Sequence, residues 1–279
     1  MLLIGIIIFS AVQSAAVKFY NRTDSDAFVF NFVKSLAACA VLAVLSAADF
    51  HINALTAAYG GIYGLSLGIS MYSGYKALAM GPMSLTSLIV SFSVVIPIFY
   101  GVFFSGEPLS NLKIVGLVFL AAALLTANMK KPEMSRKGSS YAWWIFYVAM
   151  TFMSNGLCSV LQKMHQQRYP GEYCAEFTLI SMLICGVIFL ALTLVHRSGK
   201  VSTRGKKYSA VSGAAMAAVS FMTIKLSGAE NASVLFPAIS AGTICASLLC
   251  GTIIFREKLR CNHIIALVCG IAAVICLKL

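Results

Sequence analysis

Hydroxyl side chains recur at helical spacing in two apolar segments of the chain. Within 54–80 they follow steps of four, three, four and three residues, which places them on one face of a helix: Tyr59, Tyr63, Ser66, Ser70 and Ser73. Within 208–229 a similar series comprises Ser209, Ser212, Ser220, Thr223 and Ser227. Two such faces predict a polar cavity that binds a small solute by hydrogen bonds. The alternative for any single hydroxyl is a hydrogen bond to the backbone carbonyl one turn earlier.

Amide side chains lie in two further apolar segments. Gln13 is in the segment 2–19, and Asn155 is in the segment 143–164. Asn155 shares one helix face with Trp144, Tyr147, Thr151, Cys158 and Gln162. Because an amide cannot satisfy both its donor and its acceptor on its own helix, we expect Gln13 and Asn155 to face other helices or the solute. For the aromatic residues Trp144 and Tyr63, the alternative is a position at the lipid–water interface.

Ionisable side chains within apolar segments are costly and therefore informative. Lys34 lies inside the segment 28–47, and Glu176 lies near the start of the segment 173–195. We expect Lys34 either to attract a carboxylate or phosphate of the substrate or to pair with Glu176. The alternative is that its aliphatic stem lets the ammonium group reach the membrane surface.

The sequence lacks the residue patterns typical of catalysis or metal binding. It has no phosphate-binding loop of the Walker type and no cluster of histidines and carboxylates at metal-binding or acid–base spacing. Its nine cysteines form no Cys-x-x-Cys pair, and most lie in apolar segments, where a free cysteine behaves as a small hydrophobic residue. The histidines are interpreted as interface residues near segment ends: His51, His165, His196 and His263. We therefore predict no catalytic residue, no metal, no cofactor and no enzymatic activity.

The elements that position these side chains follow from the composition. Hydrophobic residues make up 59% of the 279 positions, charged residues only 11%, and the mean hydropathy is +0.88. Soluble domains contain about 25% charged residues, so a soluble enzyme, a secreted disulfide domain and a disordered regulator are all excluded. The apolar runs are about 20 residues long, the length of a membrane-spanning helix. The net charge of +12 is spread over short loops, which is typical of membrane topology and not of nucleic-acid binding.

Ten membrane-spanning helices are predicted, five on each side of a basic linker. Their approximate ranges are 2–19, 28–47, 54–80, 82–104, 112–129, 143–164, 173–195, 208–229, 233–255 and 263–277. The predicted organisation is a first five-helix repeat at 1–129, a linker loop at 130–140 and a second five-helix repeat at 141–279. The fold class is therefore an all-α membrane protein.

Short signals indicate that the two halves are related. Gly106-Glu107-Pro108-Leu109 follows the fourth segment, and Arg256-Glu257-Lys258-Leu259 follows the ninth, 150 residues later. At the same offset Ser70 matches Ser220 and Ser73 matches Thr223. Five spans per half require the repeats to lie inverted in the membrane, the architecture of many secondary transporters, with the substrate near the midplane. We expect both Glu107 and Glu257 to accept hydrogen bonds from the backbone at a helix start.

The sequence resembles the EamA type of the drug/metabolite transporter superfamily along nearly its whole length. The resemblance is carried by 77–82 (ALAMGP), Ile96-Pro97, 104–109 (FSGEPL), Phe236-Pro237 and 255–259 (FREKL). Arg256 departs from the pattern, since the family usually has glycine there. The resemblance implies ten helices in two five-helix repeats and transport of amino acids, other small metabolites or drugs.

The basic residues predict an orientation. Fifteen lysines and arginines lie in the odd-numbered loops and five in the even-numbered loops and the C-terminus. This imbalance places the odd-numbered loops in the cytoplasm and both termini outside, whereas members of the family usually keep both termini inside.

We therefore predict a secondary transporter of the cytoplasmic membrane that moves a small polar or zwitterionic metabolite, such as an amino acid, by alternating access. The alternatives are a broad-specificity drug or metabolite exporter and a transporter of a lipid-linked substrate. The expected partners are the small-molecule substrate and the lipid bilayer, without nucleic acid, for a monomer or homodimer. The predicted substrate-binding residues are Gln13, Lys34, Tyr63, Ser66, Ser70, Trp144, Asn155, Ser220, Thr223 and Ser240.

Overall fold

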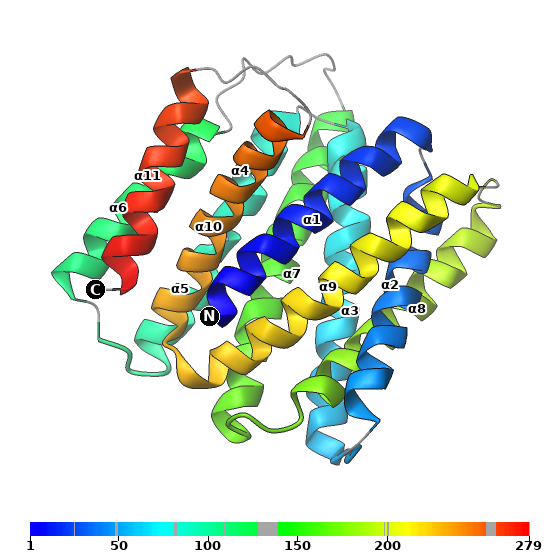
Figure 1. Cartoon of the computed structure of the whole chain (residues 1–279), viewed down its shortest axis with the longest axis horizontal. Coiled ribbons are helices and arrows are strands. Elements are labelled where there is room, and N and C mark those ends of the chain that lie inside the picture. The colour runs from blue at the N-terminus through cyan, green and yellow to red at the C-terminus, as the bar shows by residue number, and fades with distance from the viewer. Residues whose placement is uncertain are drawn as a thin grey trace. The chain divides into compact units, whose positions relative to one another are not determined.

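The computed structural model describes residues 1–24, 26–47, 50–80, 83–108, 110–127, 139–197, 199, 201–254 and 261–278, and these residues form helices and no strands. In the first half lie α1 (Leu2–Thr23), α2 (Ala27–Ser46), α3 (Ala54–Met80), α4 (Met83–Ser91), the 3-10 turn η1 (Phe92–Val94), α5 (Val95–Phe103) and α6 (Asn111–Ala127). In the second lie α7 (Ser139–Arg168), α8 (Cys174–Val195), α9 (Thr203–Ala229), α10 (Ala232–Ile253) and α11 (Cys261–Lys278). Figure 1 labels these helices. The all-helical fold is thus confirmed over the described residues.

The helices lie where the apolar segments predicted them, to within five residues at each end. The fourth segment differs, because η1 interrupts it between α4 and α5. Pro97 is the third residue of α5 and cannot donate the backbone hydrogen bond that would continue the helix from α4. Of the predicted linker at 130–140, residues 130–138 lie outside the described residues, and 139–140 belong to α7. The expected helix-start carboxylate of Glu257 also lies outside the described residues.

Six helices are long and apolar enough to cross a membrane: α1, α2, most of α7, α8, α9 and α10. Shorter apolar helices cover Ile89–Phe103, Asn111–Thr126 and Ile264–Leu277. The burial pattern agrees with this, since large apolar side chains such as Phe103, Val118 and Leu194 are exposed while Lys34 and His165 are buried. These features indicate a multi-pass membrane protein.

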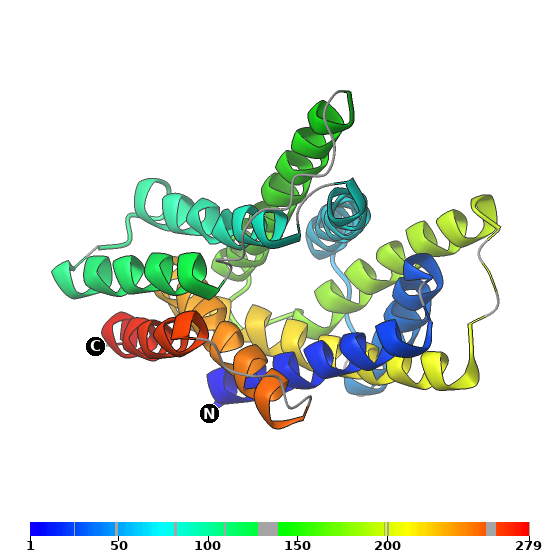
Figure 2. The ribbon, with the colours of Figure 1, turned by 90° about the horizontal axis from the view of Figure 1, so that it is seen from above.

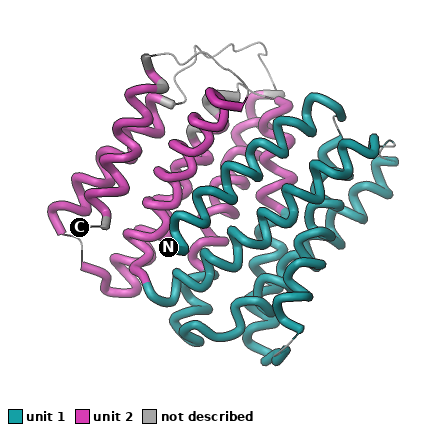
Figure 3. The backbone as a smooth tube through the Cα atoms, in the orientation of Figure 1, with its two compact units in different colours: residues 1–68, 161–229 teal, residues 69–160, 230–279 magenta. Residues whose placement is uncertain are grey.

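The chain forms two compact units, each of which takes helices from both halves of the sequence (Figure 3). Unit 1 comprises residues 1–68 and 161–229, and unit 2 comprises residues 69–160 and 230–279. Helices α3 and α7 contribute to both units. The predicted boundary at 130–140 divides the sequence into two halves, whereas each compact unit contains helices from both halves.

Unit 1 is built from antiparallel helix pairs. Helices α1 and α9 lie side by side (Figures 1 and 2), with Gly5 against Met222 near one end and Phe19 stacked on Tyr208 near the other. Helix α2 runs antiparallel to α8 and also packs on α9. Its start meets the end of α8, where the rings of Phe28 and His196 stack with centroids 4.8 Å apart.

Three glycines let α3 approach α8 closely in unit 1, the kind of contact that a Gly-xxx-Gly face favours. A Cβ at Gly60 would lie 3.0 Å from the carbonyl oxygen of Phe177, and one at Gly64 would lie 2.6 Å from that of Ser181. One turn further on, Gly68 faces Ile188. The Ser181 hydroxyl donates to the Gly60 carbonyl over 3.1 Å, a bond that spans the two helices. This face positions Tyr63 and Ser66 within unit 1.

Replacing Gly64 by alanine is expected to destabilise the protein, because the new methyl group would press on the α8 backbone, which cannot rotate away as a side chain can. The expected loss is about 1–3 kcal/mol. Gly61→Ala is the matched control, since its Cβ would meet only the Ile184 Cδ1 at 3.6 Å, an ordinary contact. Thermal unfolding of both variants in detergent tests the difference, and equal midpoints would contradict the close α3–α8 packing.

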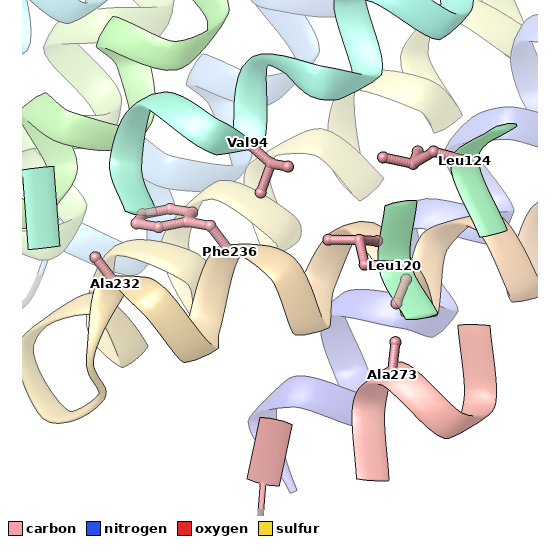
Figure 4. Close-up of a cluster of buried hydrophobic side chains, with 7 residues drawn as sticks. Val94, Leu120, Leu124, Ala232, Phe236 and Ala273 are labelled. Atoms are coloured by element: carbon pink, nitrogen blue, oxygen red, sulfur yellow. The ribbon is translucent and has the colours of Figure 1, made fainter. Parts of the chain in front are cut away.

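Unit 2 packs α10 against α5, α6 and α11, and α6 against α11. Helices α6 and α11 are antiparallel, because Gly116 near the start of α6 faces Leu277 at the end of α11. The apolar cluster in Figure 4 joins η1, α6, α10 and α11 through Val94, Leu120, Leu124, Ala232, Phe236, Ala241 and Ala273.

Glu107 anchors the start of α10 in unit 2. Its carboxylate oxygens accept hydrogen bonds from the backbone N–H groups of Ala232 at 2.7 Å and Ser233 at 2.9 Å. The sequence predicted a helix-start carboxylate, and the structure shows one, on α10 and therefore 125 residues away in the chain. Gly101 makes room for the carboxylate, and Gly106 turns the chain with a positive φ of 65°.

Candidate functional site

The predicted substrate-binding residues are divided between the two units. Unit 1 contains Gln13, Lys34, Tyr63, Ser66, Ser220 and Thr223. Unit 2 contains Ser70, Trp144, Asn155 and Ser240. The two groups are described separately, from the residues that each unit positions.

Lys34 is buried in the middle of unit 1, with 5% of its surface exposed. Its ammonium nitrogen lies 5.9 Å from the centre of the Phe30 ring. No described carboxylate pairs with it. An ammonium group inside a membrane helix is costly unless a counter-charge or an aromatic face compensates it, and a ring at this distance compensates only in part. Lys34 is therefore a candidate binding point for an anionic group.

The position of Lys34 excludes a pair with Glu176. Ser35 packs against Gly186, so this part of α2 is level with the residues around Cys185 in α8. Glu176 lies nine residues earlier in α8, and nine residues of α-helix rise about 13 Å. The expected alternative of a Lys34–Glu176 ion pair is therefore wrong for this structure, because antiparallel packing places Glu176 towards the other end of α2.

Gln13 lies at the same level of unit 1 as Lys34. The contacts of Gly5 with Met222 and of Phe19 with Tyr208 set the antiparallel register of α1 and α9, which brings Gln13 level with Ala214. The neighbouring Gly213 touches the backbone carbonyl of Lys34. The Gln13 amide forms no hydrogen bond with any described residue. It therefore keeps donor and acceptor capacity for a solute at that level.

The hydroxyls of α3 and α9 in unit 1 fall into two classes. Ser66 donates to the carbonyl of Ile62 over 2.8 Å, the local bond that was the alternative interpretation. Ser220 and Thr223 are 7% and 8% exposed, and their hydroxyls form no hydrogen bond with the described residues. Ser212 is fully buried, and its Oγ also lacks a partner there. Hydroxyls on α9 are thus better candidates for solute contact than Ser66.

Tyr63 lies at a different level of unit 1 from Lys34 and Gln13. Its hydroxyl accepts a hydrogen bond from the Gln162 amide over 3.2 Å, and its ring packs edge-on against Phe177 at the start of α8. It is 7% exposed. A buried tyrosine with these contacts is not a residue of the lipid–water interface, so that alternative is excluded for Tyr63.

Around Tyr63 the structure reveals a buried polar network that the sequence did not predict. His165 is fully buried, and its Nε2 lies 3.0 Å from the Thr56 hydroxyl. The Gln166 amide lies 3.2 Å from His165 Nδ1, donates to the Glu172 carbonyl and accepts from the Gly171 N–H. The interpretation of His165 as an interface residue is wrong, because Gln162 and His165 continue the polar face of α7 into the protein. That continuation was the signal available in the sequence.

Lys163 extends the same network to α9. Its ammonium group donates to the Ser227 carbonyl over 3.2 Å, and the Ser227 hydroxyl donates back to the Gln162 carbonyl over 3.3 Å. Lys163 is 7% exposed. Together, the bonds of this network join α7 to α9 and hold the 169–173 loop in place. The network therefore stabilises the fold.

In unit 2 the polar face of α7 is occupied by bonds to other helices. The Trp144 indole N–H donates to Thr86 over 2.9 Å, and the Thr151 hydroxyl donates to Ser73 over 2.8 Å. Trp144 is 5% exposed and packs with Ala77 and Val148, so it too lies inside the protein and not at the interface.

Asn155 keeps one half of its amide available. Its nitrogen donates to Ser93 in η1 over 2.9 Å, and its oxygen forms no hydrogen bond with the described residues. The same is true of the Ser70 hydroxyl, although Ser70 is only 9% exposed. Ser240 is half-buried on α10. Within unit 2, Asn155 is therefore the strongest candidate acceptor for a donor group of a solute.

Cysteine placed at Ser220 or Thr223 is expected to react with a hydrophilic thiol reagent, since these hydroxyls lack protein partners and a solute path would reach them. Val219 is the control, because its apolar side chain is half-buried and lies on a different face of α9 from Ser220 and Thr223. The measurement is labelling by a charged maleimide in a cysteine-free background. Equal labelling at positions 219 and 220 would show that the α9 hydroxyls only pack between helices.

Comparison with known proteins shows the fold and no more. No family model and no curated protein sequence matches the chain. Among solved structures 29 chains match. One, described as the crystal structure of a protein, superposes with a TM-score of 0.79 at 16% identity and covers 100% of this chain and 98% of that chain. A solved protein of almost the same extent therefore shares this fold.

Proposed function

We propose that the chain is a secondary transporter built from two inverted five-helix repeats. The helix starts support the repeat, because α2 and α8, α3 and α9, α4 and α10, and α6 and α11 begin 147 to 150 residues apart. Two of these matched pairs, α2 with α8 and α6 with α11, pack together and run antiparallel. Antiparallel packing of equivalent helices is what a two-fold axis in the membrane plane produces.

The proposed family is the drug/metabolite transporter superfamily, EamA type, and the proposed substrate is a small polar or zwitterionic metabolite such as an amino acid. Lys34 is the observation that carries this proposal. A buried ammonium group without a described carboxylate partner, level with the available amide of Gln13, is suited to a substrate carboxylate. Within the same unit, the Ser220 and Thr223 hydroxyls add neutral polar contacts, which suit a small organic solute better than an inorganic ion.

The same proposal places the protein in the cytoplasmic membrane as a monomer or homodimer, with the substrate and the lipid bilayer as partners and without enzymatic activity. Transport by alternating access requires the helices that line the substrate path to change their packing. The interruption of the fourth span at η1 offers one place for such a change, because its backbone already departs from α-helical bonding beside Pro97.

Reconstitution tests the proposal. The purified chain is screened by thermal shift against amino acids, nucleosides, polyamines and drugs, and each stabilising compound is then offered in radiolabelled form to proteoliposomes. We expect an amino-acid-like compound to stabilise the protein and to accumulate in proteoliposomes but not in empty liposomes. Stabilisation by drugs alone, or binding without uptake, would reject the proposed substrate class or transport itself.

A further inference from the structure

Basic side chains gather at one end of unit 1, where α1, α8 and α9 end or begin. Lys18 and Arg22 lie in the last turns of α1, and Arg197 follows the end of α8. Arg204, Lys206 and Lys207 lie in the first turns of α9. Arg22, Arg197 and the three cations of α9 are exposed, and Lys18 is half-buried. This group of six residues is called the basic end of unit 1.

Two aspartates in the turn between α1 and α2 hold these segments together. Asp24 accepts hydrogen bonds from the backbone N–H of Ser202 at 3.0 Å and from its hydroxyl at 2.6 Å. Asp26 accepts from Phe28 and Val29 at the start of α2 with one oxygen and from Gly199 with the other. The basic end is thus a fixed arrangement that joins residues about 180 positions apart in the chain.

The aspartates do not neutralise the basic end. Two carboxylates face six cations, and the hydrogen bonds from Ser202 hold the pKa of Asp24 below its usual range, so that it remains ionised. Both carboxylates are already engaged by backbone N–H groups. The net charge of the six cations and two aspartates is +4. An excess of this size on one exposed patch attracts an anionic surface.

The three cations of α9 lie at the unfavourable end of that helix. Positive side chains in the first turns oppose the helix dipole, and α9 has no acidic residue in its first turn. Arg204, Lys206 and Lys207 therefore do not serve the stability of α9. Asp24 supplies one negative charge at the start of α9, and an external anion would offset the repulsion that remains among the three cations.

The surroundings of the basic end match a lipid headgroup. Four candidate membrane spans, α1, α2, α8 and α9, end or begin there, so the cations lie at the level where headgroups are found. Leu194 and Val195, just before Arg197, are 70% and 76% exposed and offer an apolar surface to an acyl chain. We propose that the basic end of unit 1 binds anionic phospholipid headgroups of the leaflet that it faces.

The test compares lipids that differ only in headgroup charge. The full chain is purified in a neutral detergent, and its affinity for short-chain phosphatidylglycerol and phosphatidylcholine of equal chain length is measured by native mass spectrometry. The unmodified protein is expected to prefer phosphatidylglycerol. The triple variant R204Q/K206Q/K207Q is expected to lose roughly 100-fold of that affinity, since each surface cation contributes about 1 kcal/mol to anionic lipid binding.

The double variant R168Q/K225Q is the matched control, because both residues are exposed cations at the opposite end of unit 1. It should bind phosphatidylglycerol as the unmodified protein does. Equal affinity for the two lipids, or full binding by the triple variant, would overturn the proposal and leave the cations with a role in topology only. Displacement of the lipid by a few millimolar inorganic phosphate would show a site for free anions instead. Unchanged thermal unfolding of the triple variant without lipid separates lost binding from misfolding.

Discussion

Substitution of Lys34 by methionine is expected to remove substrate-induced stabilisation and transport while the protein still inserts and folds. Methionine has a similar volume and relieves the cost of a buried ammonium group, so the fold should not suffer. A charge-assisted hydrogen bond to a substrate carboxylate contributes about 1.5–3 kcal/mol, which corresponds to roughly 10- to 100-fold in affinity. The measurements are the thermal shift with the best ligand of the screen and uptake into proteoliposomes.

Lys163→Met is the matched control for this prediction. Lys163 is as buried as Lys34, but its ammonium group donates to the Ser227 carbonyl. Its loss should lower the stability of the protein without ligand, whereas the loss of Lys34 should lower the response to ligand. Lys34→Arg is expected to be tolerated only in part, because a planar guanidinium does not replace a compact ammonium. Adding Glu176→Gln should not rescue Lys34→Met, since Lys34 of α2 is level with the residues around Cys185, nine residues along α8 from Glu176. Normal uptake by Lys34→Met would remove Lys34 from the site.

The helices could be predicted from the sequence because each is a long apolar run bounded by charges, glycine or proline, a local property that membrane insertion imposes. The hydroxyls that are available to a solute could not be predicted from the sequence, because a serine that bonds to its own helix has the same spacing as one that faces a solute. Ser66 and Ser220 occupy equivalent-looking stripes, yet only Ser66 bonds to the carbonyl one turn back.

Residues that join distant parts of the chain were the least predictable. His165 and Gln166 stand near the end of an apolar segment, where polar residues usually face water, and only the contacts with Thr56 and the 169–173 loop explain their burial. The pairing of Lys34 with Glu176 failed for a related reason. The sequence shows only that both residues lie inside apolar segments, whereas antiparallel packing of α2 and α8 separates them along the helices.

Removal of the Glu107 carboxylate is expected to destabilise the protein more than any other single change at a polar residue of unit 2. Glu107→Ala leaves the N–H groups of Ala232 and Ser233 without their acceptor, and both residues are fully buried at the start of α10. Each buried donor without a partner costs about 1–3 kcal/mol, and the loss of a negative charge at a helix start adds to this. Thermal or denaturant unfolding in detergent measures the loss, and we expect the unfolding midpoint to fall clearly.

Two variants separate this capping role from a general effect of removing a carboxylate. Glu107→Gln keeps one acceptor oxygen but turns an amide N–H group towards the second backbone donor, so about half of the loss is expected. Glu172→Ala removes an exposed glutamate and should leave the midpoint within the error of the measurement. Gly101→Ala should resemble Glu107→Ala, because its methyl group would lie 2.5 Å from Glu107 Oε2 and displace the carboxylate from α10. A stable Glu107→Ala variant would mean that water or another group of the protein can satisfy the start of α10, and the link between the 104–108 turn and α10 would then not hold unit 2 together.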